Sequence, residues 1–110
     1  MEYSKETKKA FRQLILIARD RETAALMQAV QKMANAPYKE SESTTDWFWQ
    51  MEEWLYKKGK YLVDKYDCPN SVMDILVYRL YKEGHLRLDD EPMTNEVKDI
   101  LTRLEAILSR

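Results

Sequence analysis

Few side chains in this sequence have the chemistry of a catalytic or metal-binding site. Cys68 is the one cysteine and His85 the one histidine, and neither has a basic or nucleophilic partner beside it. We expect an ordinary thiol at Cys68 and a structural imidazole at His85. These two residues cannot supply the three or four nitrogen and sulfur ligands of a zinc site, and two glycines cannot form a phosphate-binding loop. The sequence therefore predicts a non-enzyme with no catalytic residue, no metal and no cofactor.

The acidic clusters also lack an evident chemical role. Glu52-Glu53 and Asp89-Asp90-Glu91 have no basic or metal partner nearby in the sequence, so we interpret them as solvated surface. The charged interval RDRE at 19–22 is interpreted in the same way, as a solvated turn of helix with local ion pairs worth about 0.2–0.5 kcal/mol each. The alternative is that this interval marks where the helix leaves its partner.

The aromatic side chains indicate binding. The stretch 46–67, DWFWQMEEWLYKKGKYLVDKYD, contains all three tryptophans. Trp47, Trp54 and Tyr61 recur every seven residues, and a neighbouring apolar stripe consists of Phe48, Met51, Leu55 and Leu62. This spacing predicts an amphipathic helix of about six turns with one broad apolar face.

Trp47 and Trp49 cannot both pack into the same core. At 100° per residue they lie about 200° apart on a helix. One of them must therefore face a second surface, and exposed aromatic residues are the usual anchors of protein interfaces. The alternative is that the second tryptophan packs beneath the first or the C-terminal helices. The aromatic residues that point to an interface are Trp47, Phe48, Trp49, Trp54 and Tyr61.

The rest of the chain predicts an all-α fold. A first helix runs from an N-cap at Ser4 to about Asn35 and is ended by Pro37. A polar loop precedes the aromatic helix, which Thr45 or Asp46 caps. The later elements are a third helix ended by Gly84, a brief extended segment HLRL at 85–88, and a last helix from Thr94 or Asn95 to Ser109.

The length of the first helix suggests self-association. Thirty helical residues extend about 45 Å, whereas a compact 110-residue chain has a radius of gyration near 13 Å. We expect one elongated domain with two long antiparallel helices (1–66, the dimerisation part) and a small C-terminal helical head (67–110). A two-fold interface would cover the apolar surface that one copy leaves exposed, which predicts a homodimer.

Composition limits the partners. A net charge of −1 gives no electrostatic reason to expect nucleic acid. No apolar run approaches the roughly 20 residues that span a bilayer, and the polar N-terminus does not resemble a secretory signal. A single cysteine suits a reducing compartment, so we expect a soluble, cytoplasmic protein.

A family resemblance follows from the segment between Trp49 and Leu86. The chain is similar there, without a gap, to the fluorescence recovery protein family of cyanobacteria. The matching positions are Trp49-Gln50, Met51, Glu53, Trp54-Leu55, Lys57-Lys58, Lys65-Tyr66-Asp67, Ser71-Val72 and Glu83-Gly84. The match covers a little over a third of the chain, and the remaining residues resemble the family only in being helical.

The resemblance implies a cofactor-free, all-helical homodimer that acts in photoprotection. Family members bind the C-terminal domain of photoactivated orange carotenoid protein. They return that protein from its red, quenching form to its orange, resting form, which restores phycobilisome fluorescence.

The resemblance also implies which residues bind the partner. The functional tryptophan of the family falls on Trp49 and its aspartate on Glu53, whereas its arginine falls on Gly59. Lys58 or Lys60 is the nearest substitute for that arginine, although lysine lacks the planar fork of a guanidinium. Together with the aromatic residues, the expected partner or dimer interface comprises Trp47, Trp49, Glu53, Trp54, Lys58 and Lys60.

Two departures from the family pattern leave other functions open. Gly59 replaces the arginine, and Cys68-Pro69-Asn70 replaces an aromatic-rich turn. Both changes suggest a divergent relative with a different protein partner. One alternative is a structural or assembly adaptor with an unrelated partner. Another is a winged-helix-like nucleic-acid module, in which the third helix and HLRL at 85–88 would form the recognition helix and a wing.

Overall fold

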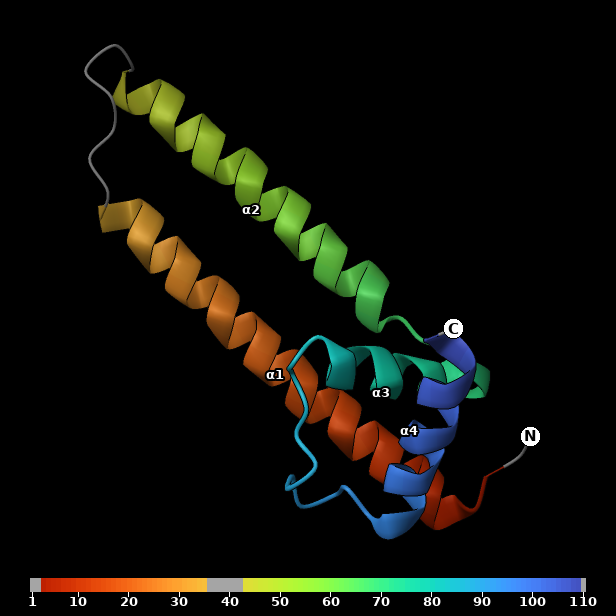
Figure 1. Cartoon of the computed structure of the whole chain (residues 1–110). Helices are drawn as coiled ribbons and strands as arrows, with labels where there is room; N and C mark the ends of the chain where they lie inside the picture. The colour runs from red at the N-terminus through yellow and green to blue at the C-terminus, as the bar shows by residue number, and fades with distance from the viewer. Residues whose placement is uncertain (1–2, 36–42, 110) are drawn as a thin grey trace. The chain divides into compact units, whose positions relative to one another are not determined.

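The regular elements of the chain are helices. The computed structural model describes residues 3–35 and 43–109, and all the regular structure in these ranges is helical (Figure 1). Both long helices and the all-α class are therefore as predicted. The described elements are α1 (Lys5–Asn35), α2 (Thr44–Tyr66), the 3-10 turn η1 (Asn70–Val72), α3 (Met73–Lys82) and α4 (Asn95–Leu108). Among these helices, none has both the length and the apolar character needed to cross a bilayer.

Short polar side chains cap the N-terminal ends of α1 and α2. The hydroxyl of Ser4 accepts a hydrogen bond from the Thr7 N–H at 3.1 Å, which confirms the predicted cap of α1. The cap predicted for α2 is wrong by two or three residues. Ser43, not Thr45 or Asp46, accepts the Asp46 N–H at 3.1 Å. Asp46 lies instead in the first turn, where the helix dipole favours a carboxylate. The predicted stop at Pro37 lies outside the described residues.

Gly84 ends the α3 region as predicted. Its φ of +88° is accessible to glycine at no steric cost. The following His85 N–H donates to the Leu80 carbonyl at 3.0 Å, as in a Schellman motif. The segment 85–88 forms no strand, which leaves the winged-helix alternative without a wing strand.

The chain divides into two compact units, and the first joins the segment up to Arg21 with the segment from Cys68 onward. The early turns of α1 therefore share a core with the C-terminal helices. Leu86 and Met93, from the connection between α3 and α4, are buried in this unit as well. The buried apolar residues from its helices are Ala10, Phe11, Leu14, Ala18, Met73, Leu76, Val77, Leu80, Val97, Ile100 and Leu101.

A partly buried ion pair holds the connection between α3 and α4 against α1. Arg21 donates to both carboxylate oxygens of Asp90, at 2.7 and 2.9 Å, and also to the His85 carbonyl at 2.9 Å. The Asp90 side chain is only 5% exposed. The hydrogen bond from Arg21 is the main cause that lowers the pKa of Asp90 to about 2. The interpretation as solvated surface is therefore wrong for Asp90, and Arg21 pairs with this distant residue rather than locally, whereas Arg19 and Asp20 are exposed as expected.

The second unit runs from Glu22 to Asp67 and is a helical hairpin. The latter part of α1 and the whole of α2 run in opposite directions beside each other (Figure 1). In residues 22–35 and 43–67, Lys65 is the one residue classed as buried. The hairpin thus leaves most of its apolar side chains partly or fully accessible.

Candidate protein-interaction site

The α2 helix has a seven-residue repeat that makes it apolar on most of its circumference. Residues 47–67 divide into WFWQMEE, WLYKKGK and YLVDKYD, and the first three positions of each segment are apolar. These positions form three columns along the helix, each about 100° around the axis from the next. The first column is Trp47, Trp54 and Tyr61; the second is Phe48, Leu55 and Leu62; the third is Trp49, Tyr56 and Val63. A soluble helix usually has one apolar stripe, so α2 has more apolar surface than one neighbour can cover.

The first column turns toward α1. Trp47 and Trp54 are half-buried, as is Met51, which lies between them on the same side of α2. The Lys58 ammonium lies 5.8 Å from the centre of the Trp54 ring, within the range of a cation–π contact. This part of the helix therefore packs in the hairpin.

The third column faces away from the hairpin and is exposed. Trp49, Tyr56 and Val63 retain 58%, 69% and 68% of their accessible surface. The ring of Trp49 makes an edge-to-face contact with Phe48, with centroids 5.2 Å apart. The sequence analysis named Trp49 but missed Tyr56 and Val63. The same seven-residue period that identified the first column could have identified them.

The second column borders a groove between the two helices of the hairpin. Val30 and Met33 of α1 form one wall, and the groove has a volume of about 230 Å³. Glu52 is the charged residue at its edge, and the other α2 residues that line it are Phe48, Met51, Trp54 and Leu55. Because Phe48 and Leu55 remain exposed, the groove is accessible.

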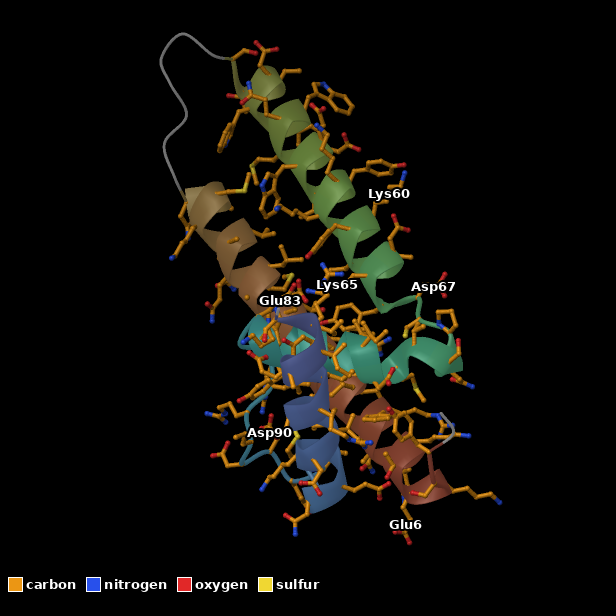
Figure 2. The ribbon with its side chains drawn as sticks, turned by 45° about the vertical axis from the view of Figure 1, so that its right-hand side comes forward. Glu6, Lys60, Lys65, Asp67, Glu83 and Asp90 are labelled. Atoms are coloured by element: carbon orange, nitrogen blue, oxygen red, sulfur yellow. The ribbon has the colours of Figure 1, made fainter. Side chains whose placement is uncertain are left out.

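A buried ion pair joins the two helices of the hairpin near the C-terminal end of α2. The Lys65 ammonium lies 2.8 Å from Glu22 Oε1, and the Tyr66 hydroxyl donates to the same oxygen at 2.8 Å. The Lys65 side chain is 2% exposed and lies 5.5 Å from the centre of the Tyr61 ring. Figure 2 shows Lys65 on the side of α2 that faces α1, whereas Lys60 projects away from α1. Sequence analysis missed this pair because it joins residues 43 apart.

The six predicted interface residues divide between two sides of α2. Taking Trp47 as 0°, Trp49, Glu53 and Lys60 lie near 200°, 240° and 220° by the ~100° rotation per residue. The other three lie on the side of α1: Trp47, Trp54 and Lys58. Glu53 forms an exposed ion pair with Lys57 at 3.0 Å, which is worth at most about 1 kcal/mol. One surface thus contains Trp49, Glu53 and Lys60 together with Tyr56 and Val63.

Three other titratable side chains of the first unit, Cys68, His85 and Glu105, have structural contacts. The Cys68 thiol donates to the Pro69 carbonyl at 3.3 Å, and His85 Nε2 lies 3.6 Å from a carboxylate oxygen of Glu83. The Tyr78 hydroxyl donates to Glu105, which is the main cause that lowers the pKa of Glu105. Each of these contacts joins neighbouring elements or adjacent residues of one unit.

Comparison with known proteins finds no match: no family model, no curated protein and no solved structure is significantly similar to this chain.

Proposed function

We propose that this chain is a non-catalytic regulatory adaptor that forms a homodimer through α2 and binds another protein. The observation that carries the proposal is the exposure of the third column, Trp49, Tyr56 and Val63. A tryptophan or tyrosine can bury about 150–250 Å². Exposed aromatic side chains on one side of a helix are typical anchors of a protein interface.

A second copy of the chain fits this surface in an antiparallel orientation. A two-fold axis at Tyr56 would bring Trp49 of one copy opposite Val63 of the other, so that a large side chain meets a small one. Glu53 and Lys60 lie on the same flank of the column. In an antiparallel helix pair, each flank of one helix meets the same flank of the other. Glu53 of each copy would therefore lie opposite Lys60 of the other. A parallel pair would instead bring Glu53 toward Glu52, which repels it.

The protein partner is proposed from the resemblance. The first candidate is the C-terminal domain of orange carotenoid protein, which the family returns to its resting state. A regulator of this kind acts by binding a compact form of its target better than the activated form. Trp49 and Glu53 are exposed in one copy of the chain, so this target and a second copy would compete for the same surface. Gly59, in the place of the family's arginine, favours the alternative of an adaptor with an unrelated protein partner.

The test of the dimer is its molar mass in solution. Light scattering at micromolar concentration should give twice the chain mass for the natural sequence. Tyr56→Asp should give the monomer mass with unchanged helicity, because Tyr56 is exposed and a carboxylate there would be desolvated in the interface. Gln50→Asp adds the same group to the polar side of α2 and should leave the dimer intact. A monomeric natural chain, or a dimeric Tyr56→Asp variant, would refute this interface.

The test of the partner is separate from that of the dimer. The dimer should accelerate the return of photoactivated orange carotenoid protein to its orange form, measured by absorbance after illumination. Trp49→Ala should slow this return while helicity is kept, and the molar mass of the variant, measured alongside, separates a lost partner contact from a lost dimer. A chain that dimerises but leaves the recovery rate unchanged would be consistent with the proposed dimer and would refute orange carotenoid protein as the partner.

A further inference from the structure

The N-terminal part of α1 has a second surface of a different character. Five cationic residues lie on one side of this helix, within a sector of about 100°. Leu16 lies among them and is exposed. We call this surface the basic stripe; its cationic members are Lys5, Lys8, Lys9, Arg12 and Arg19.

The basic stripe faces outward from the first unit. The opposite side of the helix carries the buried residues Thr7, Ala10, Phe11, Leu14 and Ala18. Lys5, Lys9 and Arg12 are exposed, and within the described part of the chain they form no ion pair. Their charges are therefore available to a ligand.

The stability of α1 does not explain the basic stripe. Cations near a helix N-terminus oppose the helix dipole, which favours anions at that position. Lys5 and Lys9 are also a like-charged pair four residues apart, as are Lys8 and Arg12, and such pairs destabilise a helix by a few tenths of a kcal/mol. The arrangement therefore lowers the stability of the free protein, and a negatively charged ligand would remove that cost.

A groove runs beside the basic stripe. Lys9, Gln13 and Leu16 line it from α1, and Glu91, Pro92 and Thr94 line it from the connection between α3 and α4. Its volume is about 640 Å³. Leu16 and the half-buried Ile17 give the groove an apolar part next to the cationic side chains.

We propose that the basic stripe and this groove bind an acidic segment of another protein, one that presents carboxylates and an apolar side chain on the same face. Carboxylates would pair with Lys5, Lys9 and Arg12, and the apolar side chain would cover Leu16. Glu6 and Glu91 also line the groove, so the groove would take the apolar side chain while the carboxylates stay at the cationic side chains of the basic stripe. The continuous phosphates of a nucleic acid could not be divided in this way. This surface belongs to the first unit, whereas the proposed dimer surface on α2 belongs to the second.

The test compares two anionic probes on the full chain. The first is a fluorescent synthetic helix of glutamate and leucine residues, and the second is mixed-sequence duplex DNA. Fluorescence anisotropy should show that the peptide binds more tightly than the DNA, with an affinity that falls as salt is added.

Two matched double variants identify the surface. Lys9→Glu with Arg12→Glu should weaken peptide binding by about tenfold or more, because two charge-assisted contacts become repulsive. The same variant should melt at a higher temperature than the natural chain, which separates lost binding from lost folding. Lys32→Glu with Lys98→Glu changes the net charge equally and should keep the binding.

Three results would overturn the proposal. The first is equal loss of peptide binding in both double variants, which would mean attraction by net charge alone. The second is binding of DNA in preference to the peptide that depends on Lys9 and Arg12, which would assign the basic stripe to phosphates. The third is the absence of binding to either probe.

Discussion

Lys65 and Glu22 form a buried ion pair across the hairpin, with 2.8 Å between the ammonium nitrogen and a carboxylate oxygen. The Glu22 side chain is 12% exposed, so both charges are largely removed from water. Burying a charge is costly unless it is paired, which makes each residue dependent on the other. This pair also joins the first residue of the second unit to the end of α2.

Removing one member of this pair should destabilise the hairpin strongly. Lys65→Met should lower the free energy of unfolding by about 3 kcal/mol, because it leaves the Glu22 carboxylate buried without its ammonium partner. Combining Lys65→Met with Glu22→Leu should recover most of that loss, since no unpaired charge remains. Urea denaturation followed by circular dichroism, at one protein concentration, measures both. A double variant as unstable as the single one would show that the pair is not the source of the effect.

Asp90 should make the first unit sensitive to acid. Its pKa is lowered from about 4 in the unfolded chain to about 2 in the folded chain, so the ionised form is the one that folding stabilises. This contribution is complete above pH 4 and is lost as the pH falls toward 2. It amounts to about 1–2 kcal/mol, allowing for solvent around Arg21, whose side chain is 38% exposed.

The pH dependence has a matched control beside Asp90. Asp90→Asn should lower the free energy of unfolding at neutral pH. It should also make that free energy less dependent on pH between pH 4 and 2. Asp89→Asn changes a neighbouring carboxylate whose side chain is 81% exposed, and it should leave this pH dependence nearly unchanged. Equal effects of the two substitutions on chemical denaturation would contradict the role given to the Arg21 contact.

The two glycines should respond to alanine in opposite directions. Nothing lies within 4 Å of a Cβ atom placed on Gly59, and helical glycine costs about 1 kcal/mol relative to alanine. Gly59→Ala should therefore raise the melting temperature. Gly84→Ala should lower the melting temperature, because alanine is strained at a φ of +88°. The loss in the free energy of unfolding should be of similar size to the gain at Gly59. A destabilising Gly59→Ala would show that a partner copy approaches the backbone there.

Gly59 also allows a test of the resemblance. Gly59→Arg supplies the charge that the family has at this position, and the open space around Gly59 accepts the side chain. If the chain acts on orange carotenoid protein, this substitution should raise the recovery rate, with Gly59→Gln as the uncharged control. An unchanged rate in both variants would favour an unrelated partner.

The proposed register of the dimer predicts a charge-reversal pattern. Glu53→Lys or Lys60→Glu alone should weaken the dimer by about tenfold, since each change creates two repulsive contacts across the two-fold axis. The double variant restores opposite charges and should recover the natural dissociation constant, measured by analytical ultracentrifugation. Additive weakening in the double variant would rule out the antiparallel register.

Local sequence signals predicted the helices but not their long-range contacts. Ser4, Gly84 and Thr94 mark helix ends by their own backbone and side-chain chemistry, and the structure uses all three. In contrast, Asp90 binds an arginine 69 residues away, and Glu22 binds a lysine 43 residues away. No local pattern identifies such partners, so these acidic residues were assigned to the surface. Tyr56 and Val63 differ from these residues, because their seven-residue spacing from Trp49 is a local signal that the sequence does contain.

The repeat in α2 also raises the question of how the hairpin avoids sliding. A displacement of one repeat, about 10.5 Å along the axis, would bring apolar residues to equivalent positions and would set Lys58 in the place of Lys65. Gly59 would then replace Tyr66, and Glu22 would lose the hydroxyl that now donates to it. The Tyr66 hydroxyl is therefore one contact that the native alignment has and the shifted alignment lacks.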